Sequence, residues 1–297
     1  MALFREGHKT AVLAFLRQTF PGQDWDLTLP PHGTGQEAYF ARHRNGEYFI
    51  KLGAHVERYQ ALSALELAPR VIGAGWLSND TTIAVQEKIG GHLPSRQDFH
   101  LYLEQFAQAI RTTHRSATLK RVLPPKPIDS FEAAGLEALT QVEQRWNRFK
   151  PTVPACATFV DESLGKLRTQ ICRFRGGGLV ASHNDVCNGN WLVSSTGRVY
   201  LLDYESMSLD DPAQDLGAIL WWYYPPHLRS RFLEIAGYRD DDEFRQRMRI
   251  RMALHCLNII LPRENSFDQF DAEAFDKDLD DFRAVMAGRE NPQGYAD

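Results

Sequence analysis

The chain has 297 residues, of which 43% are hydrophobic and 24% charged, proportions that are ordinary for a soluble globular protein. The net charge of -4 gives no electrostatic case for a nucleic-acid partner, which would favour a basic surface, so we expect none. No apolar run is long enough to span a bilayer, and the first residues lack the apolar core of a signal peptide. These features favour a cytoplasmic protein without a membrane partner.

Four cysteines, at positions 156, 172, 187 and 256, are widely spaced and form no Cys-x-x-Cys pair. This pattern predicts neither a disulfide framework nor a cysteine metal site, but four reduced thiols that are mostly buried. Cys187 has a second interpretation as a nucleophile, for which His183 is the nearby candidate base.

The first part of the chain is predicted to begin with a helix, followed by strands with a second helix among them. The expected elements are, in order, a helix over 9–20, two strands joined through the turn at Asn45-Gly46, a helix over 55–67, and strands at 71–74 and 82–86. Gly90-Gly91 then breaks the pattern, which makes residues 87–92 a candidate hinge. We therefore expect a first lobe over 1–88 and a second over 89–297.

The second part of the chain is mainly helical. The expected elements are a helix along Phe99–His114 with Ser95 and Asp98 close to a capping box, a helix beginning near Asp129, another through 164–171, a short strand at 179–181, and a hairpin of 191–193 with 198–202. Strands gathered in one part and helices in the other predict an α+β fold rather than alternating βαβ units.

The motif with the clearest chemistry is His183-x-Asp185 followed by Asn190, which fits His-x-Asp-x-x-x-x-Asn. Phosphoryl transfer needs a metal-held triphosphate, a positioned hydroxyl and a group that accepts the hydroxyl proton. Asp185 can accept that proton, and the amide oxygen of Asn190 can bind Mg²⁺. The alternative is an Asx-rich turn between two strands.

Asp203 lies thirteen residues after Asn190 and ends the apolar run 199–202. A carboxylate at a strand end, close in sequence to Asp185 and Asn190, is where a second Mg²⁺ ligand is expected. Taken by itself, Asp203 is also compatible with an ordinary turn.

Lys51 lies mid-strand between apolar residues, as does the strand lysine that contacts ATP phosphates in kinases. Glu57, in the following helix, can pair with it. The alternative is a lysine that points to solvent from a half-buried strand.

Two further positions are candidates for nucleotide contacts. Gly33 and Gly35 precede the strands and would let backbone N–H groups approach phosphates, or they form only a turn. Glu87 and Lys88, at the hinge, would present backbone groups to adenine; this assignment depends on their position in the chain alone.

The order of Lys51, Glu57, the His183–Asn190 motif and Asp203 resembles the aminoglycoside phosphotransferase / choline kinase family. Asp211-Pro212-Ala213-Gln214-Asp215-Leu216 resembles the Asp-Pro-x-x-Asp-Leu segment of that family. Two departures are Asn184, where the family often has glycine, and a short glycine-rich region. Asp203 is followed by Tyr-Glu rather than Phe-Gly, and no Ala-Pro-Glu follows, which argues against a protein substrate.

The resemblance implies a two-lobed protein-kinase-like fold with a small β-rich first lobe and a larger, mainly helical second lobe. It implies an enzyme that uses ATP and Mg²⁺ to phosphorylate a small-molecule hydroxyl. The catalytic residues would be Asp185, as base, and His183. The metal ligands would be Asn190 and Asp203, and Lys51 would contact phosphate.

Two segments bear on the phosphate acceptor. Residues 264–282 carry eight acidic side chains against one lysine, which would attract a cationic substrate or form a solvated helix face with phenylalanines on its buried side. Trp221-Trp222-Tyr223-Tyr224 would hold a quaternary ammonium by cation–π attraction or pack in the core. An aminoglycoside-like acceptor is favoured, with choline, an amino alcohol or another metabolite as the alternative. A nucleotide-binding module without catalysis is the alternative from another class.

Overall fold

The computed structural model describes residues 2–22, 24–30, 38–44, 46–78, 80–174, 176, 178–262 and 271–296, with the side chains of 2–7 left aside. The chain forms two compact units. The first consists of Met1–Leu93 with Trp191–Glu205, and the second of Pro94–Asn190 with Ser206–Asp297. The lobe boundary expected between 88 and 89 stays a prediction.

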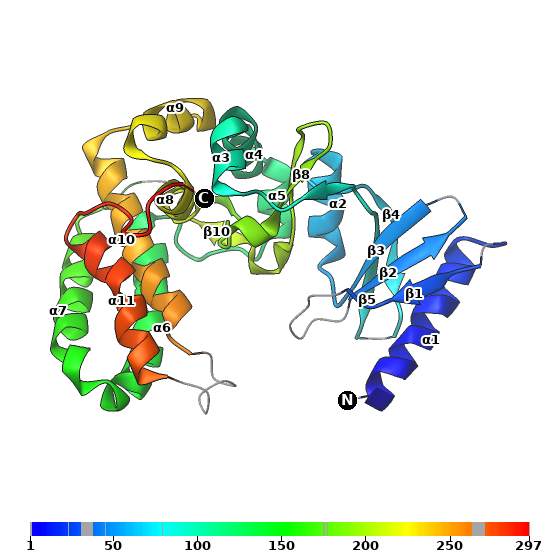
Figure 1. The fold of residues 1–297 in the computed structure, drawn as a ribbon, viewed down its shortest axis with the longest axis horizontal. Coiled ribbons are helices and arrows are strands. Elements are labelled where there is room, and N and C mark those ends of the chain that lie inside the picture. Colours follow the sequence, from blue (N-terminus) through cyan, green and yellow to red (C-terminus); the bar gives the residue numbers. More distant parts are fainter. Residues whose placement is uncertain are drawn as a thin grey trace. The chain divides into compact units, whose positions relative to one another are not determined.

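The first unit is built on a five-stranded antiparallel sheet in the order β1-β2-β3-β5-β4 (Figure 1). Its strands are β1 (Asp26–Thr28), β2 (Ala38–His43), β3 (Gly46–Leu52), β4 (Val71–Trp76) and β5 (Thr82–Glu87). The predicted hairpin is confirmed, because β2 pairs with β3 with Ala38 opposite Lys51. Asn45, in its turn, lies outside the described residues.

Helix α1 (Ala2–Thr19) packs on this sheet through an apolar stripe and begins before the predicted residue 9. Val12 and Leu16 are fully buried in one core cluster with Ile50 and Val85 of the sheet. A side chain at Gly75 of β4 would come within 2.9 Å of the Phe15 ring, so this glycine permits the close approach of helix and strand.

Helix α2 (Val56–Ala64) follows β3, and a smaller sheet completes the first unit. That sheet has the order β6-β8-β9, from β6 (Gly91–His92), β8 (Trp191–Ser194) and β9 (Val199–Leu201). The predicted hairpin of 191–193 with 198–202 is confirmed. Gly91 is required here because a Cβ atom would lie 2.3 Å from the Val193 carbonyl oxygen.

The second unit is mainly helical, as predicted. Its helices are α3 (Arg96–Leu101), α4 (Leu103–Arg115), α5 (Ala117–Val122), α6 (Phe131–Phe149), α7 (Pro154–Ile171), α8 (Ala213–Tyr223), α9 (Pro226–Ala236), α10 (Asp242–Ile260) and α11 (Ala272–Met286). Helix α10 packs against α6, α8 and α11 (Figure 1). The α+β fold class is confirmed by these two units.

Two predictions about the start of this unit meet different outcomes. The capping box is present, with the Ser95 hydroxyl accepting from the Asp98 N–H and the Asp98 carboxylate accepting from the Ser95 N–H. The single helix expected along Phe99–His114 is wrong, because the backbone leaves helical geometry at Tyr102 (φ -104°, ψ 30°) and divides it into α3 and α4.

A short antiparallel pair of strands leads into the predicted catalytic loop. β7 (Val180–Ser182), expected from the sequence, pairs with β10 (Ser208–Asp210), which was not expected, and Ser182 lies opposite Ser208. Within the described part of the chain, no helix has the length and apolar character needed to cross a bilayer.

Candidate active site

Lys51 and Asp203 come together within the first unit. The Lys51 side chain belongs to β3 and is buried, so the solvent-pointing alternative is wrong. Its ammonium nitrogen lies 3.8 Å from Oδ1 of Asp203, whose side chain is 48% exposed. A buried strand lysine beside a half-exposed carboxylate provides both charges that a metal-bound phosphate chain needs.

Asp203 adopts a left-handed backbone conformation with φ of 52°, which is uncommon for a residue other than glycine. The turn behind it is held by α2. Arg58 donates to the carbonyl oxygens of Tyr204, at 3.2 Å, and Glu205, at 3.1 Å. The Tyr59 hydroxyl donates to the Glu205 carboxylate at 3.2 Å, and burial together with that carboxylate raises the pKa of Tyr59 well above its usual range.

The residues of α2 that contact the site differ from the one predicted from the sequence. Glu57, expected to pair with Lys51, is exposed in the first turn of α2, and no ion pair is recorded for it among the described residues. The contacts of Arg58 and Tyr59 were not predicted. The only signal in the sequence was their place directly after Glu57, in a helix with a buried face. Their role is to fix the chain that follows Asp203.

The remaining nucleotide candidates are placed as follows. The Glu87 N–H donates to the Arg70 carbonyl oxygen at 2.9 Å, and the Lys88 N–H donates to that of Glu47 at 3.0 Å. These two backbone donors are therefore already used within the first unit and are not available to adenine. Gly33 and Gly35 lie outside the described residues.

In the second unit, one buried carboxylate holds the start of the predicted catalytic loop. The N–H groups of His183 and Asn184 each donate to Asp215, at 2.8 Å in both cases. Asp215 lies in the first turn of α8, and both it and His183 are fully buried. The sequence motif located Asp215 but did not reveal that it accepts these two backbone donors.

A histidine that the sequence analysis did not select completes this contact. His114 of α4 is buried and places Nε2 3.0 Å from the Asp215 carboxylate, with Nδ1 2.8 Å from the Tyr238 hydroxyl. Burial raises the pKa of Asp215, but the hydrogen bond and charge of His114 with the charge and N–H of His183 outweigh it. The pKa of Asp215 therefore lies below its usual range, and the carboxylate remains ionised.

Asp185 and Asn190 are brought together in the same loop. The Asn190 side-chain NH₂ group donates to the Asp185 carbonyl oxygen at 2.9 Å, which leaves the amide oxygen as the atom able to bind a cation. The Asn190 N–H closes the turn by donating to the Cys187 carbonyl oxygen at 3.0 Å. The Asp185 side chain is half-buried. This loop therefore places a candidate base and a candidate metal ligand within six residues of each other.

Cys187 does not have the properties of a nucleophile. Desolvation of the thiol, together with the charge and hydrogen bond of Asp185, raises its pKa to about 11, so it stays protonated near neutral pH. All four cysteines are free thiols; Cys156 and Cys256 are buried, whereas Cys172 and Cys187 are exposed, so the expectation of mostly buried thiols holds for two of them.

The four adjacent aromatic residues, Trp221–Tyr224, lie at the end of α8 and differ in burial. Trp221 and Tyr224 are buried in the core, whereas Trp222 and Tyr223 are half-buried. The Tyr223 hydroxyl accepts from the Asn188 N–H at 2.8 Å, and its ring stacks on Phe99 with 4.0 Å between centroids. Tyr223 therefore adjoins the Asp185 loop and can offer at most its second ring face to a ligand.

The acidic segment follows the solvated-face interpretation where it is described. On α11, Phe275, Leu279 and Phe282 are buried, whereas Asp276 and Asp280 are exposed and both pair with Arg283. This arginine offsets part of the negative charge that would attract a cationic acceptor. Glu264, Asp268 and the phenylalanines at 267 and 270 lie outside the described residues.

A fold of one β-rich and one mainly helical unit, carrying a strand lysine and the His-x-Asp-x-x-x-x-Asn loop, defines a kinase-like phosphotransferase. Residues 26–249 match the phosphotransferase enzyme family, and the chain belongs to that family. The predictions of the family and of an enzyme of this class are therefore confirmed.

Several solved structures can be superposed on nearly the whole length of this chain. The choline kinase LicA from Streptococcus pneumoniae is 18% identical with a TM-score of 0.67, covering 95% of this chain and 99% of its own. A choline/ethanolamine kinase family protein from Mesorhizobium loti is 18% identical with a TM-score of 0.71, covering 97% and 96%. A spectinomycin phosphotransferase, in complex with ADP and spectinomycin, is 16% identical with a TM-score of 0.63, covering 93% of this chain and 98% of its own. At these identities the likeness establishes the protein-kinase-like fold.

Proposed function

We propose that this enzyme transfers the γ-phosphoryl group of ATP to a hydroxyl group of a small molecule, with Asp185 as the base that accepts the hydroxyl proton. The observation that carries the proposal is the loop start held on Asp215, where two consecutive N–H groups donate to one buried carboxylate. Such anchoring fixes the backbone immediately before Asp185, and catalysis by positioning requires this rigidity. His183 contributes through its backbone to the same anchor.

The nucleotide side of the proposal relies on Lys51 and Asp203. Their separation of 3.8 Å allows the ammonium to contact a phosphate oxygen while the carboxylate faces a bound cation. The ADP in the spectinomycin phosphotransferase structure supports a nucleotide in this fold. Glu57, Gly33, Gly35, Glu87 and Lys88 stay predicted nucleotide contacts, the last two without their N–H groups as donors.

The residues present fit Mg²⁺ by donor chemistry. The Asp203 carboxylate and the Asn190 amide oxygen are hard oxygen donors of the kind that Mg²⁺ prefers. The described residues contain no cluster of three or more His, Cys, Asp or Glu side chains able to hold a metal, so phosphate and water oxygens would complete the shell, as is usual for Mg²⁺. When bound, Mg²⁺ would neutralise developing charge on the phosphate oxygens.

For the acceptor we propose a small cationic alcohol. An aminoglycoside is the first candidate on the acidic composition of 264–282 in the sequence. The part of this segment on α11 forms a solvated face, and Arg283 offsets part of its charge. Choline or an amino alcohol is the second candidate, favoured by the half-buried ring of Tyr223 beside the Asp185 loop. A cation over that ring gains about 0.5–2 kcal/mol, equivalent to roughly a 2- to 30-fold change in affinity.

The test is a screen of ATP consumption and phosphorylated product over aminoglycosides, choline, ethanolamine, sugars and amino-acid alcohols. We expect turnover with a cationic member of this set. If choline is the acceptor, Tyr223→Leu should raise its KM about 10-fold, whereas Tyr223→Phe, which keeps the ring, should not. Nucleotide binding without turnover of any acceptor would refute the proposal and favour the non-catalytic nucleotide-binding module.

A further inference from the structure

Asn184 stands where the family often has glycine, and its backbone conformation explains the preference. Its φ is 66°, in the left-handed region that glycine adopts without strain and asparagine tolerates better than most other residues. Conformation alone would therefore be satisfied by glycine. The asparagine side chain must be explained by its contacts.

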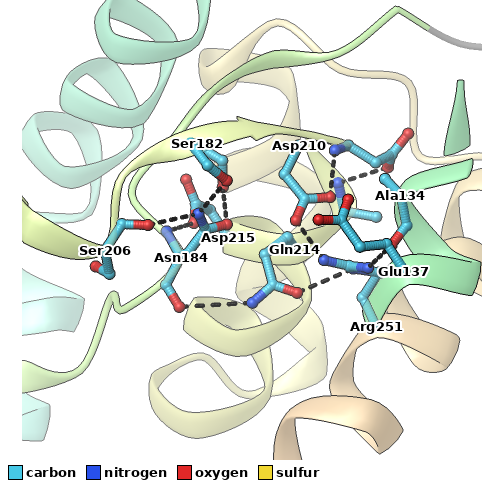
Figure 2. A network of polar contacts seen from close by, with 12 residues as sticks. Ala134, Glu137, Ser182, Asn184, Ser206, Asp210, Gln214, Asp215 and Arg251 are labelled. Carbon is cyan, nitrogen blue, oxygen red and sulfur yellow. Dashed lines mark hydrogen bonds and ion pairs between the residues drawn. The ribbon is translucent and has the colours of Figure 1, made fainter. Parts of the chain in front are cut away.

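The Asn184 amide makes three hydrogen bonds. Figure 2 shows Asn184 with Ser182 and Ser206 among the polar contacts of the second unit. Its oxygen accepts from the Ser182 hydroxyl at 2.9 Å. Its NH₂ group donates to the Ser206 carbonyl oxygen at 2.8 Å and to the Ser208 hydroxyl at 2.9 Å. Both amide hydrogens are therefore used, and both go to segment 206–208.

Segment 206–208 also donates a hydrogen bond back to the Asp185 loop. The Ser206 hydroxyl donates to the His183 carbonyl oxygen at 2.8 Å, while the Ser206 carbonyl accepts from Asn184. Ser182 and Ser208 face each other in the pairing of β7 with β10. The amide thus continues the contact between these two strands to Asn184, two residues beyond the end of β7, in the loop that carries Asp185.

The backbone of Asn184 is fixed at the same time by α8. Its N–H donates to Asp215 at 2.8 Å, and its carbonyl oxygen accepts from the Gln214 side chain at 3.5 Å. Gln214 in turn accepts from Arg251 of α10 at 2.9 Å, and Arg251 contacts Asp210 at 2.5 Å (Figure 2). Arg251 is buried, so its end of this chain of contacts is shielded from water.

We propose that Asn184 is a positioning residue whose side-chain amide clamps the Asp185 loop to segment 206–208. This inference depends on the proposed function, because the loop it positions carries the proposed base. Segment 206–208 begins three residues after Asp203 in the sequence, so the clamp ties the loop of the base to the chain that continues from the proposed metal ligand. Glycine at this position would allow the conformation but leave the two segments unlinked by a side chain.

The test compares Asn184→Gly and Asn184→Asp with the native enzyme. Glycine keeps the left-handed backbone and removes all three side-chain hydrogen bonds. Aspartate keeps the acceptor for Ser182 but places an oxygen against the Ser206 carbonyl oxygen in place of a donor. We expect both to lower kcat about 10- to 100-fold, the range that small misplacement of a catalytic group produces, with nucleotide KM changed less than about 3-fold. Glu66→Gly is the matched control. Glu66 also has a left-handed backbone, with φ of 59°, but it lies outside the proposed site, so this variant should keep the native kcat.

Hydrogen exchange of the peptide covering 183–190 is the second readout and needs no turnover. It should quicken in Asn184→Gly and stay unchanged in Glu66→Gly. Unchanged kcat together with unchanged exchange in Asn184→Gly would overturn the clamp, as would a fall in thermal stability with kcat retained. If the native enzyme phosphorylates no acceptor, the proposed function fails, while exchange alone decides whether the amide orders the loop.

Discussion

Replacing Asp215 with asparagine changes one oxygen of a fully buried carboxylate into an NH₂ group. The native carboxylate accepts the N–H groups of His183 and Asn184, and His114 lies 3.0 Å from it. An amide keeps one oxygen and replaces the other with an NH₂ group. In one orientation this NH₂ group faces the N–H of Asn184, and in the other it faces the N–H of His183 and His114, so neither orientation satisfies all three partners. We therefore expect Asp215→Asn to loosen the loop before Asp185 as well as to destabilise the fold.

The size of the stability loss follows from the burial of the Asp215 carboxylate. Each hydrogen bond to a charged acceptor contributes about 1.5–3 kcal/mol, and removing one partner of a buried charged pair costs about 3–5 kcal/mol. We expect a loss of about 4 kcal/mol in the free energy of unfolding, a large share of the roughly 5–15 kcal/mol typical of a protein. Below the unfolding temperature, kcat should fall about 100-fold because the loop no longer holds its position.

The assay is urea unfolding at neutral and acidic pH, with kcat measured on the folded enzyme. The pKa of Asp215 is lowered in the folded state, so its contribution is complete above its ordinary value of 3.8 and is lost as the pH falls through the lower folded value. The stability difference between native enzyme and Asp215→Asn should therefore shrink below that pH. A loss under about 1 kcal/mol at neutral pH, with unchanged kcat, would refute the reasoning.

Two further predictions concern single side chains. Lys51→Met should raise nucleotide KM about 10-fold while leaving the thermal unfolding temperature nearly unchanged, because methionine fills a similar buried volume. Lys126→Met, whose native ammonium pairs with Glu137 at 2.7 Å, is the control and should bind nucleotide normally. An unaltered KM in Lys51→Met would contradict the phosphate contact. Alkylation of Cys187, followed by mass spectrometry, should be slow near pH 7 and accelerate up to its pKa of about 11, whereas a rate that is flat between pH 7 and 9 would contradict the protonated thiol.

Local patterns were enough to predict most of the fold. The β2–β3 and β8–β9 hairpins followed from apolar runs around turn residues, and the capping box at Ser95 followed from residue spacing. The break at Tyr102 could not be predicted, because nothing in the helical spacing of 99–114 interrupts it. Strand β10, at Ser208–Asp210, also escaped prediction, since it has three residues and pairs with a strand far away in sequence.

The candidate site shows the same limit. Motif spacing selected Lys51, Asp185, Asn190 and Asp203, because chemistry restricts those positions to few residue types. The groups that hold them were not predictable in this way. His114 meets Asp215 across 101 positions of sequence, and Arg58 meets Tyr204 across 146, and neither pairing leaves a local pattern. Asn184 was noticed only as a departure from glycine, and its three contacts became evident in the structure.

The base assigned to Asp185 is tested most directly by single-turnover transfer of labelled γ-phosphate from ATP to the acceptor found in the screen. Asp185→Asn should slow transfer by about 10²- to 10⁴-fold, the usual contribution of a general base, while nucleotide affinity measured by calorimetry stays within about 3-fold. Asp242→Asn, whose side chain is 94% exposed, is the control and should transfer at the native rate. Native transfer by Asp185→Asn would contradict the central claim.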